Sequence, residues 1–358
     1  MLETSSIARG ARRITLLACA LTLSTPLFAE QNDYQVTTLV ADQSTQSSKA
    51  PNTDGNLKNA WGLVAGATST FWISANHTGF STLYNGLGAQ ISPPSPVVVP
   101  PTSGTGPGSP TGITTNPSKA DFLVDGTAAI FLWATEDGGI AAWKGGPSAT
   151  ITFAAKDGAV YKGIAVAGNG TELRLYAADF HNGKIDVLDN TFAPTTVPGG
   201  FADPKMPARF RPFNIMNLQG NLYVAYAVRE DDGDDEVAGE GLGFVDVFDA
   251  DGFLIERVAS RGKLNAPWGM AIAPAGFGRF SNHLLVGNNG DGRINAYDLK
   301  NFTFDGQLGT PNGRLLTIDG LWGLSFGNGF QHQPTDTLFF TAGPNEETNG
   351  LFGKIEAQ

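Results

Sequence analysis

Carboxylate, amide and imidazole side chains recur along this sequence, each time just after an apolar, aromatic-rich run. Oxygen ligands of this kind can coordinate a hard cation such as Ca²⁺ if they meet at one place. A simpler interpretation, which we favour, is that each Asp or Asn accepts hydrogen bonds from the backbone of its own tight turn. The candidates are Asn76, His77, Glu136, Asp137, Asp179, His181, Asn288 and Asn289.

Two of these candidates are histidines that follow aromatic-rich runs in the same way. His77 follows the first run and His181 the third. A pair of imidazoles could share a metal or act as acid and base, but a metal site needs a third convergent ligand. The sequence supplies none at a fixed spacing, so the pair alone is weak evidence for chemistry.

An acidic run at residues 230–240 is the strongest local charge feature, with seven carboxylates in eleven residues. It lacks the ligand spacing of an EF-hand loop. Self-repulsion predicts a solvated, mobile loop. The alternative is a Ca²⁺ site or a surface for a basic partner, with Asp231, Asp232, Asp234 and Asp235 as the metal ligands.

The elements that must position these residues come from a repeat of 50–55 residues. Each copy opens with an apolar, glycine-centred strand, continues with an aromatic-rich strand and a polar turn, and returns through a third strand. A period of this length, with dense Gly and Pro turns and no helical periodicity, predicts an all-β fold with six propeller blades. The anchor residues of the six copies are Gly62, Gly112, Gly163, Asn214, Gly269 and Gly323.

The first strand of each blade is expected to line a central tunnel, where glycine relieves crowding. The sixth copy ends after three strands, which would leave an open edge, and residues 34–40 are predicted to fill it and close the ring. Trp61, Trp268 and Trp322 each precede an anchor glycine. We expect a shared structural role near the tunnel entrance, with an aromatic platform for a ligand as the alternative.

These repeats resemble the NHL family of β-propellers. The local match is Leu175-Tyr176-Ala177-Ala178-Asp179 followed by Gly183-Lys184-Ile185. Over most of the chain, segments such as Asn59-Ala60-Trp61-Gly62-Leu63 and Asp319-Gly320-Leu321-Trp322-Gly323-Leu324 resemble a bacterial family of exported six-bladed propellers. Some of its members carry a PEP-type sorting tail at the C-terminus, which this sequence lacks. The resemblance implies a fold and an export route but no reaction.

Residues 1–29 have the pattern of a secretory signal peptide, because three arginines precede a short apolar run and a small-residue cleavage site. Residues 30–358 are then expected to form one domain, periplasmic or extracellular, without a transmembrane segment and monomeric. The only cysteine, Cys19, lies in the leader. The formal net charge of -11 disfavours nucleic acid as a partner.

The sequence shows no catalytic signature such as a nucleophile elbow or a phosphate-binding loop. The leading hypothesis is therefore a scaffold that binds a small molecule, a glycan or a protein on the turn-rich face. The alternative is a metal-dependent hydrolase or lyase that resembles the gluconolactonase and streptogramin-lyase propellers. Its cation would be held over the tunnel by Asn76, Glu136, Asp179 and Asn288, with His77 and His181 in support.

Overall fold

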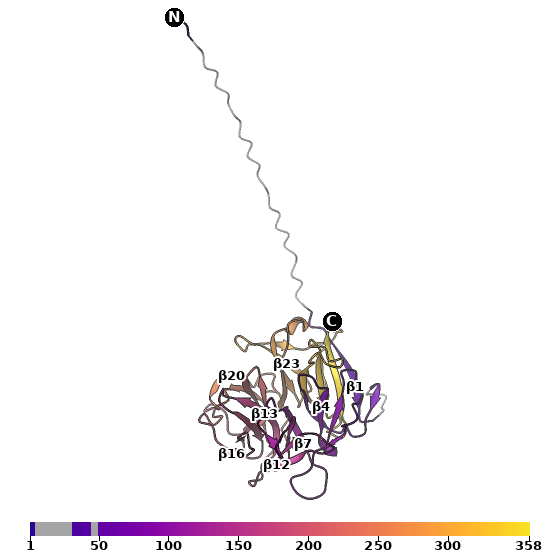
Figure 1. Cartoon of the computed structure of the whole chain (residues 1–358). Coiled ribbons are helices and arrows are strands. Elements are labelled where there is room, and N and C mark those ends of the chain that lie inside the picture. The colour runs from indigo at the N-terminus through magenta and orange to yellow at the C-terminus, as the bar shows by residue number, and fades with distance from the viewer. Residues whose placement is uncertain (4–30, 44–48) are drawn as a thin grey trace. The chain divides into compact units, whose positions relative to one another are not determined.

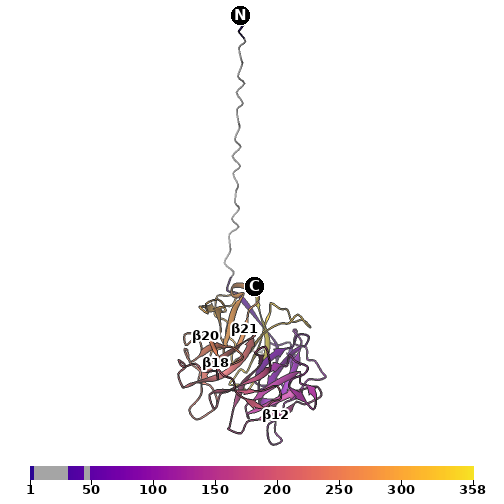
Figure 2. The same ribbon diagram turned by 60° about the vertical axis from the view of Figure 1, so that its left-hand side comes forward.

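Six antiparallel sheets follow one another around a common centre in a computed structural model that describes residues 1–3, 31–43 and 49–358. Figures 1 and 2 show these sheets in chain order, from indigo to yellow. Residues 31–358 form one compact unit. The predicted all-β, six-bladed propeller is confirmed. The predicted signal peptide lies outside the described residues, apart from residues 1–3.

Each blade runs from an inner strand to an outer strand in the order of the chain, except that the outer strand of the sixth blade comes from the N-terminus. The first three blades are β3 (Ala60–Ala65), β4 (Phe71–Ala75), β5 (Phe80–Tyr84) and β6 (Val97–Val98); β7 (Pro110–Thr115), β10 (Phe131–Thr135), β11 (Gly139–Trp143) and β12 (Thr150–Ala154); and β13 (Tyr161–Gly168), β14 (Leu173–Asp179), β15 (Lys184–Leu188) and β16 (Pro194–Thr195). A short hairpin of β8 (Leu123–Val124) and β9 (Thr127–Ala128) lies within the second.

The remaining blades have the same order. They are β17 (Phe210–Leu218), β18 (Asn221–Val228), β19 (Phe244–Phe248) and β20 (Leu254–Ser260); β21 (Pro267–Ile272), β22 (His283–Asn288), β23 (Ile294–Asp298) and β24 (Phe304–Gln307); and β25 (Leu321–Phe326), β26 (Leu338–Ala342), β27 (Leu351–Ala357) and β1 (Tyr34–Ala41), with the two-residue β2 (Asn52–Thr53) beside β1. Two 3₁₀ turns, Asn76–Thr78 and Gly278–Phe280, complete the elements.

The ring is closed by strand β1, which pairs antiparallel with β27 from Tyr34 opposite Ala357 to Ala41 opposite Leu351. In Figure 1 the indigo strand lies beside the yellow C-terminal strand. The hydroxyl of the buried Tyr34 donates a hydrogen bond to the carbonyl of Phe277 at 3.0 Å. The predicted closing strand is thereby confirmed, and it supplies the fourth strand that the sixth repeat lacks.

Crowding at the tunnel explains why the inner strands carry glycine. A methyl group on Gly62 would overlap the carbonyl oxygen of Thr111 in the next blade, and one on Gly112 would lie 2.8 Å from the amide nitrogen of Ile164. Asn214 replaces glycine in the fourth blade and donates its side-chain amide to the carbonyl of Trp268 at 2.8 Å. Each inner strand therefore packs directly on its neighbour, which fixes the residues around the anchors on the ring axis.

Candidate functional site

The residues before the six anchors form a plug. Five of them contact one another through their rings or the Lys162 ammonium, and Thr111 donates its hydroxyl to the carbonyl of Tyr161 in the next blade. All six are buried, with exposed fractions between 0% and 4%. Four are aromatic, one is a threonine and one carries a charge. In chain order the plug consists of Trp61, Thr111, Lys162, Phe213, Trp268 and Trp322.

The indoles of the plug pack on one another. Trp61 stacks on Trp322 at a centroid distance of 3.9 Å, and Trp268 meets Trp322 edge-on at 5.7 Å. Trp322 Nε1 donates to the side-chain oxygen of Asn59 at 3.0 Å, whereas Trp61 Nε1 is buried without a hydrogen-bond partner. The three predicted tryptophans thus close the tunnel at the level of the plug, and their buried indoles offer no face for a sugar to stack on at this end.

Lys162 is the charged member of the plug. Its ammonium group lies 2.6 Å from Glu136 Oε1, 3.6 Å from Asp235 Oδ1 and 4.9 Å from the ring centroid of Trp61. Burial lowers the pKa of Lys162, but the attraction of Glu136, Glu236 and Asp235 outweighs it and the net shift is upward. Lys162 is therefore a fixed cation at neutral pH and not a nucleophilic amine.

Two further carboxyl groups at this end of the tunnel have raised pKa values. Burial is the main cause for both Glu236 and Glu347, and it raises each pKa to about 7 against the opposing attraction of Lys162. Glu347 also accepts a hydrogen bond from the Asn59 amide at 2.7 Å, and its Oε2 lies 3.9 Å from His77 Nε2. Both groups are thus partly protonated near neutral pH.

These residues form one cluster where the turns of several blades meet above the plug. Asn76 takes part because its amide donates to Glu136 Oε2 at 2.8 Å, which joins the first two blades. We call this cluster the axial polar centre; it consists of Asn59, Asn76, His77, Glu136, Lys162, Asp235, Glu236 and Glu347.

The other candidates from the sequence hold their own turns. Asp137 accepts hydrogen bonds from the Thr102 backbone amide and the Thr135 hydroxyl, both at 2.5 Å. Asp179 is fully buried and accepts from the backbone and side-chain amides of Asn182. Asp179 follows the simpler interpretation, in which the side chain stabilises its own turn. Asp137 also joins its turn to the Thr102 segment, 35 residues earlier in the chain.

The amide candidates of the fifth blade are also engaged locally. Asn288 donates to the carbonyl of Lys263 at 2.8 Å and to Asp291 at 3.0 Å, while its oxygen accepts from Asn265 and Asn295. The backbone amide of Asn289 donates to the carbonyl of Ala266. The ligands predicted to hold a cation over the tunnel are Asn76, Glu136, Asp179 and Asn288. Of these four, only Asn76 and Glu136 are hydrogen-bonded to each other.

The acidic run is part of a hairpin that extends β18, so part of the expected loop is paired, while Glu230, Asp231, Asp232 and Asp235 are exposed as expected. Arg229 forms a β-bridge with Glu236, and the amide of Glu230 donates to the carbonyl of Asp235 at 2.9 Å. Asp234 is held by two basic side chains, because it lies 2.7 Å from His181 Nδ1 and 3.0 Å from Arg229 Nη1. We call residues 229–236 the acidic hairpin.

The arrangement does not fit a divalent cation held by the predicted ligands. Glu136 already faces the Lys162 ammonium with one oxygen and the Asn76 amide with the other. Asp234 and Asp235 face His181 and Lys162, whereas Asp231 and Asp232 are exposed. His77 and His181 contact different acids and share no partner among the described residues.

A third set of carboxylates converges in the third blade but is likewise occupied by a protein cation. Asp157, Asp179 and Asp186 could present oxygen atoms within 4.8 Å of one another. The ammonium group of Lys184 lies 2.8 Å from Asp157 and from Asp186 and 3.8 Å from Asp179. The cluster is therefore an internal ion-pair network.

Sequence reasoning missed Lys162 and Asn59. The signal for Lys162 was present, because it precedes the anchor Gly163 at the position where three other blades carry tryptophan. A lysine among tunnel-facing aromatic residues must bury its charge, and a buried charge needs partners. Asn59 precedes Trp61 by two residues, and its backbone has a φ of 45°, a conformation that Asn tolerates better than most residues.

The raised carboxyl pKa values predict a pH effect on stability. The folded pKa of Glu236 and Glu347 is about 7, above the ordinary value of 4.5. Protonation therefore stabilises the fold, and this contribution is lost as pH rises from about 4.5 through about 7. Circular-dichroism melts between pH 5.5 and 8.5 should show a fall of about 2–4 °C that the E236Q/E347Q double variant lacks.

The matched control for this experiment is E256Q, which changes an exposed carboxylate on β20. It should keep the full pH dependence of the unmodified chain. An E236Q/E347Q variant with the same pH dependence as E256Q would show that these two groups do not titrate near neutrality.

Known proteins resemble this chain in sequence and, at lower identity, in fold. No protein-family model matches it. Protein R648 of Acanthamoeba polyphaga mimivirus is 32% identical over 326 residues, which cover 87% of this chain and 78% of that protein. This relative does not test the predicted bacterial origin or the predicted export, so both stay predictions.

Solved structures share the fold at low identity. A Bacteroides thetaiotaomicron protein of unknown function matches with a TM-score of 0.56 and 10% identity, over 90% of this chain and 76% of that one. Virginiamycin B lyase from Staphylococcus aureus matches with a TM-score of 0.51 and 13% identity, over 90% of this chain and 99% of that one. Fold and sequence together show that the chain is a six-bladed β-propeller that belongs to the same family as mimivirus protein R648.

Proposed function

We propose that this protein is an exported ligand-binding propeller whose site is the axial polar centre, and that its ligand is a small molecule with a cationic group. The observation that carries the proposal is the buried Lys162, which is surrounded by more negative charge than it can neutralise. Glu136 and Asp235 lie within 4 Å of its ammonium, and Glu236 and Glu347 interact with it electrostatically. Buried charge of this kind is typical of functional sites.

The charge balance selects the class of ligand. Four carboxyl groups face one ammonium, so ionisation of Glu236 and Glu347 adds two negative charges to a centre where Glu136 and Asp235 already outnumber Lys162. In the free protein, protons near neutral pH offset this excess. A ligand ammonium would replace those protons, because a nearby positive charge lowers the pKa of a carboxyl group. Binding at pH 7 should therefore release protons.

The floor of the site also favours a small ligand. The plug closes the tunnel beneath the centre, and its indoles are buried. A glycan that stacks on exposed tryptophan finds no platform here, whereas a compact amine needs only the carboxylates and amides of the centre.

A second candidate function is a metal-independent hydrolase or lyase at the same place. The observation in its favour is that two carboxyl groups, Glu236 and Glu347, have a pKa of about 7. Groups poised near the working pH are suited to general acid and base catalysis. The pKa of Lys162 is raised, so its role would be electrostatic and not nucleophilic.

Export and a monomeric state stay part of the proposal. Export rests on residues 1–29, where arginines, an apolar run and small residues follow one another as in a signal peptide. Among the described residues, no helix is long and apolar enough to cross a membrane.

A thermal-shift comparison tests the proposal with ligands matched in shape. Glucosamine and N-acetylglucosamine share a ring but differ in charge, and spermidine is an unrelated amine. We expect glucosamine or spermidine to raise the melting temperature of the unmodified chain, because a ligand that binds only the native state stabilises it. N-acetylglucosamine should have a smaller effect than glucosamine. E347Q should lose most of the shift, and E256Q should keep it.

Two results would contradict the proposal. One is the absence of any shift with the amines, and the other is an equal shift in E347Q and E256Q. Ca²⁺ at matched ionic strength serves as a further arm of the experiment. A shift with Ca²⁺ but with neither amine would favour the metal-dependent alternative instead.

A further inference from the structure

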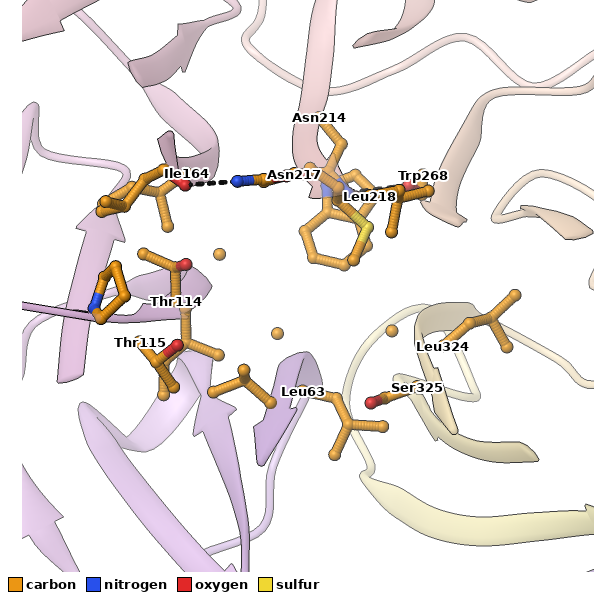
Figure 3. A pocket seen from close by; sticks show the side chains of 18 residues that line it. Leu63, Thr114, Thr115, Ile164, Asn214, Asn217, Leu218, Trp268, Leu324 and Ser325 are labelled. Atoms are coloured by element: carbon orange, nitrogen blue, oxygen red, sulfur yellow. Dashed lines mark hydrogen bonds between the residues drawn. The ribbon is translucent and has the colours of Figure 1, made fainter. Parts of the chain in front are cut away.

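The tunnel contains a cavity of about 410 Å³ on the side of the plug away from the axial polar centre. Figure 3 shows it with Leu63, Ile164 and Leu324 around an open centre. Inner strands of all six blades contribute to its wall, and Trp268 of the plug lines it as well. A volume of this size is within the range of small-molecule pockets.

The repeat itself produces this cavity. The anchors Gly62, Gly112 and Gly323 line it and present no side chain to the tunnel. The next residue in each of these strands is Leu63, Ile113 or Leu324, and all three are at least nine-tenths buried. The combination of missing and apolar side chains leaves a space with an apolar wall.

The polar groups of the cavity are few and uncharged. None of the residues that line it, all in the described part of the chain, carries a charge. Asn217 uses its amide nitrogen for the carbonyl of Val166 and its oxygen for the amide of Gly220. Thr114, Thr115 and Ser325 place hydroxyl groups at the edge of the open centre. A charged ligand would lose its hydration here without gaining a counter-charge.

We propose that this cavity is a second binding site and that it takes a neutral small molecule with an apolar body and one hydroxyl or carbonyl group. The apolar body lies against Leu63, Ile164 and Leu324, and the polar group bonds the hydroxyls of Thr114 and Thr115. The site shares no residue with the axial polar centre and is independent of the function proposed for it.

Calorimetric titration with two aromatic probes that share one ring system tests this site. 1-Naphthol is neutral with one hydroxyl group, whereas 1-naphthoate carries a charge on the same ring system. We expect 1-naphthol to bind at least about tenfold more tightly, because the cavity offers the carboxylate no partner. The tryptophan of S325W should fill the cavity from its partly exposed edge and abolish binding of 1-naphthol.

Two control variants make the result specific. T127W places the same side chain on the exposed hairpin strand β9, away from the cavity, and should bind 1-naphthol as the unmodified chain does. E347Q should also leave naphthol binding unchanged, because Glu347 belongs to the other site. Equal affinity for the two probes, no binding of 1-naphthol, or full binding by S325W would each overturn the proposal.

Discussion

A chain that lacks residues 31–41 is expected to lose the cooperative unfolding transition of the intact propeller and to aggregate. Strand β1 is paired with β27 over its whole length, and the deletion removes Tyr34, Val40 and Ala41 from the core. It also exposes the edge of β27, and an open edge pairs readily with other chains. A typical domain is stable by only about 5–15 kcal/mol, so the loss of a whole strand and its core residues is expected to unfold most of the population.

A cross-link tests the same closure in a chain that still folds. Thr37 lies opposite Lys354 in the β1–β27 register. A C19S/T37C/K354C variant should form a disulfide under oxidising conditions, because opposed residues of an antiparallel pair are close enough to be joined. The C19S/T37C/E256C control should form none, since its second cysteine is in the fourth blade. Equal cross-linking of the two variants would contradict the closure of the ring by β1.

Replacement of Lys162 by methionine is expected to cost about 3–5 kcal/mol, because it leaves the carboxylate of Glu136 without its buried counter-ion. Methionine fills most of the space of the lysine stem, so lost charge and not lost volume dominates the effect. Urea unfolding measures the change. The K162M/E136Q double variant should recover part of the stability, since it removes the unpaired charge together with its partner.

The matched control for this cycle is K263M, which removes an exposed lysine paired with the exposed Glu240. A surface pair of this kind contributes at most about 1 kcal/mol. The ion pair does not hold the axial polar centre together if K162M lowers the unfolding free energy no more than K263M does. The same conclusion follows if the losses caused by K162M and E136Q simply add in the double variant.

The fold was predictable because its signals are local and repeated. Six anchors with a 50–55-residue period identify the inner strands. The period is clear although the fourth copy has Asn214 in place of glycine. Residues 34–40 were predictable as the closing strand because the sixth repeat lacks its fourth strand. The role of Asp179 was also predictable, since a carboxylate in a tight turn bonds the backbone of that turn.

The candidate site was only partly predictable because its contacts join distant blades. Asn76 and Glu136 were predicted as turn residues on one face and, in the alternative, as ligands of one cation, but their direct hydrogen bond across two blades has no sequence signature. The acidic hairpin was expected to repel itself. Its partners His181 and Lys162 lie in the third blade, so the sequence showed the acidic residues of the hairpin without the side chains that contact them.

The central claim is that the axial polar centre binds a cationic ligand in exchange for protons, and one calorimetric titration tests it most directly. Spermidine is titrated into the chain at pH 7 in two buffers with different ionisation enthalpies. The account predicts a binding heat that depends on the buffer in the sense of proton release, because Glu236 and Glu347 begin with a pKa of about 7 and end near a cation. E347Q should bind more weakly and release fewer protons. No binding, binding without proton release, or unchanged binding and proton release in E347Q would contradict the claim.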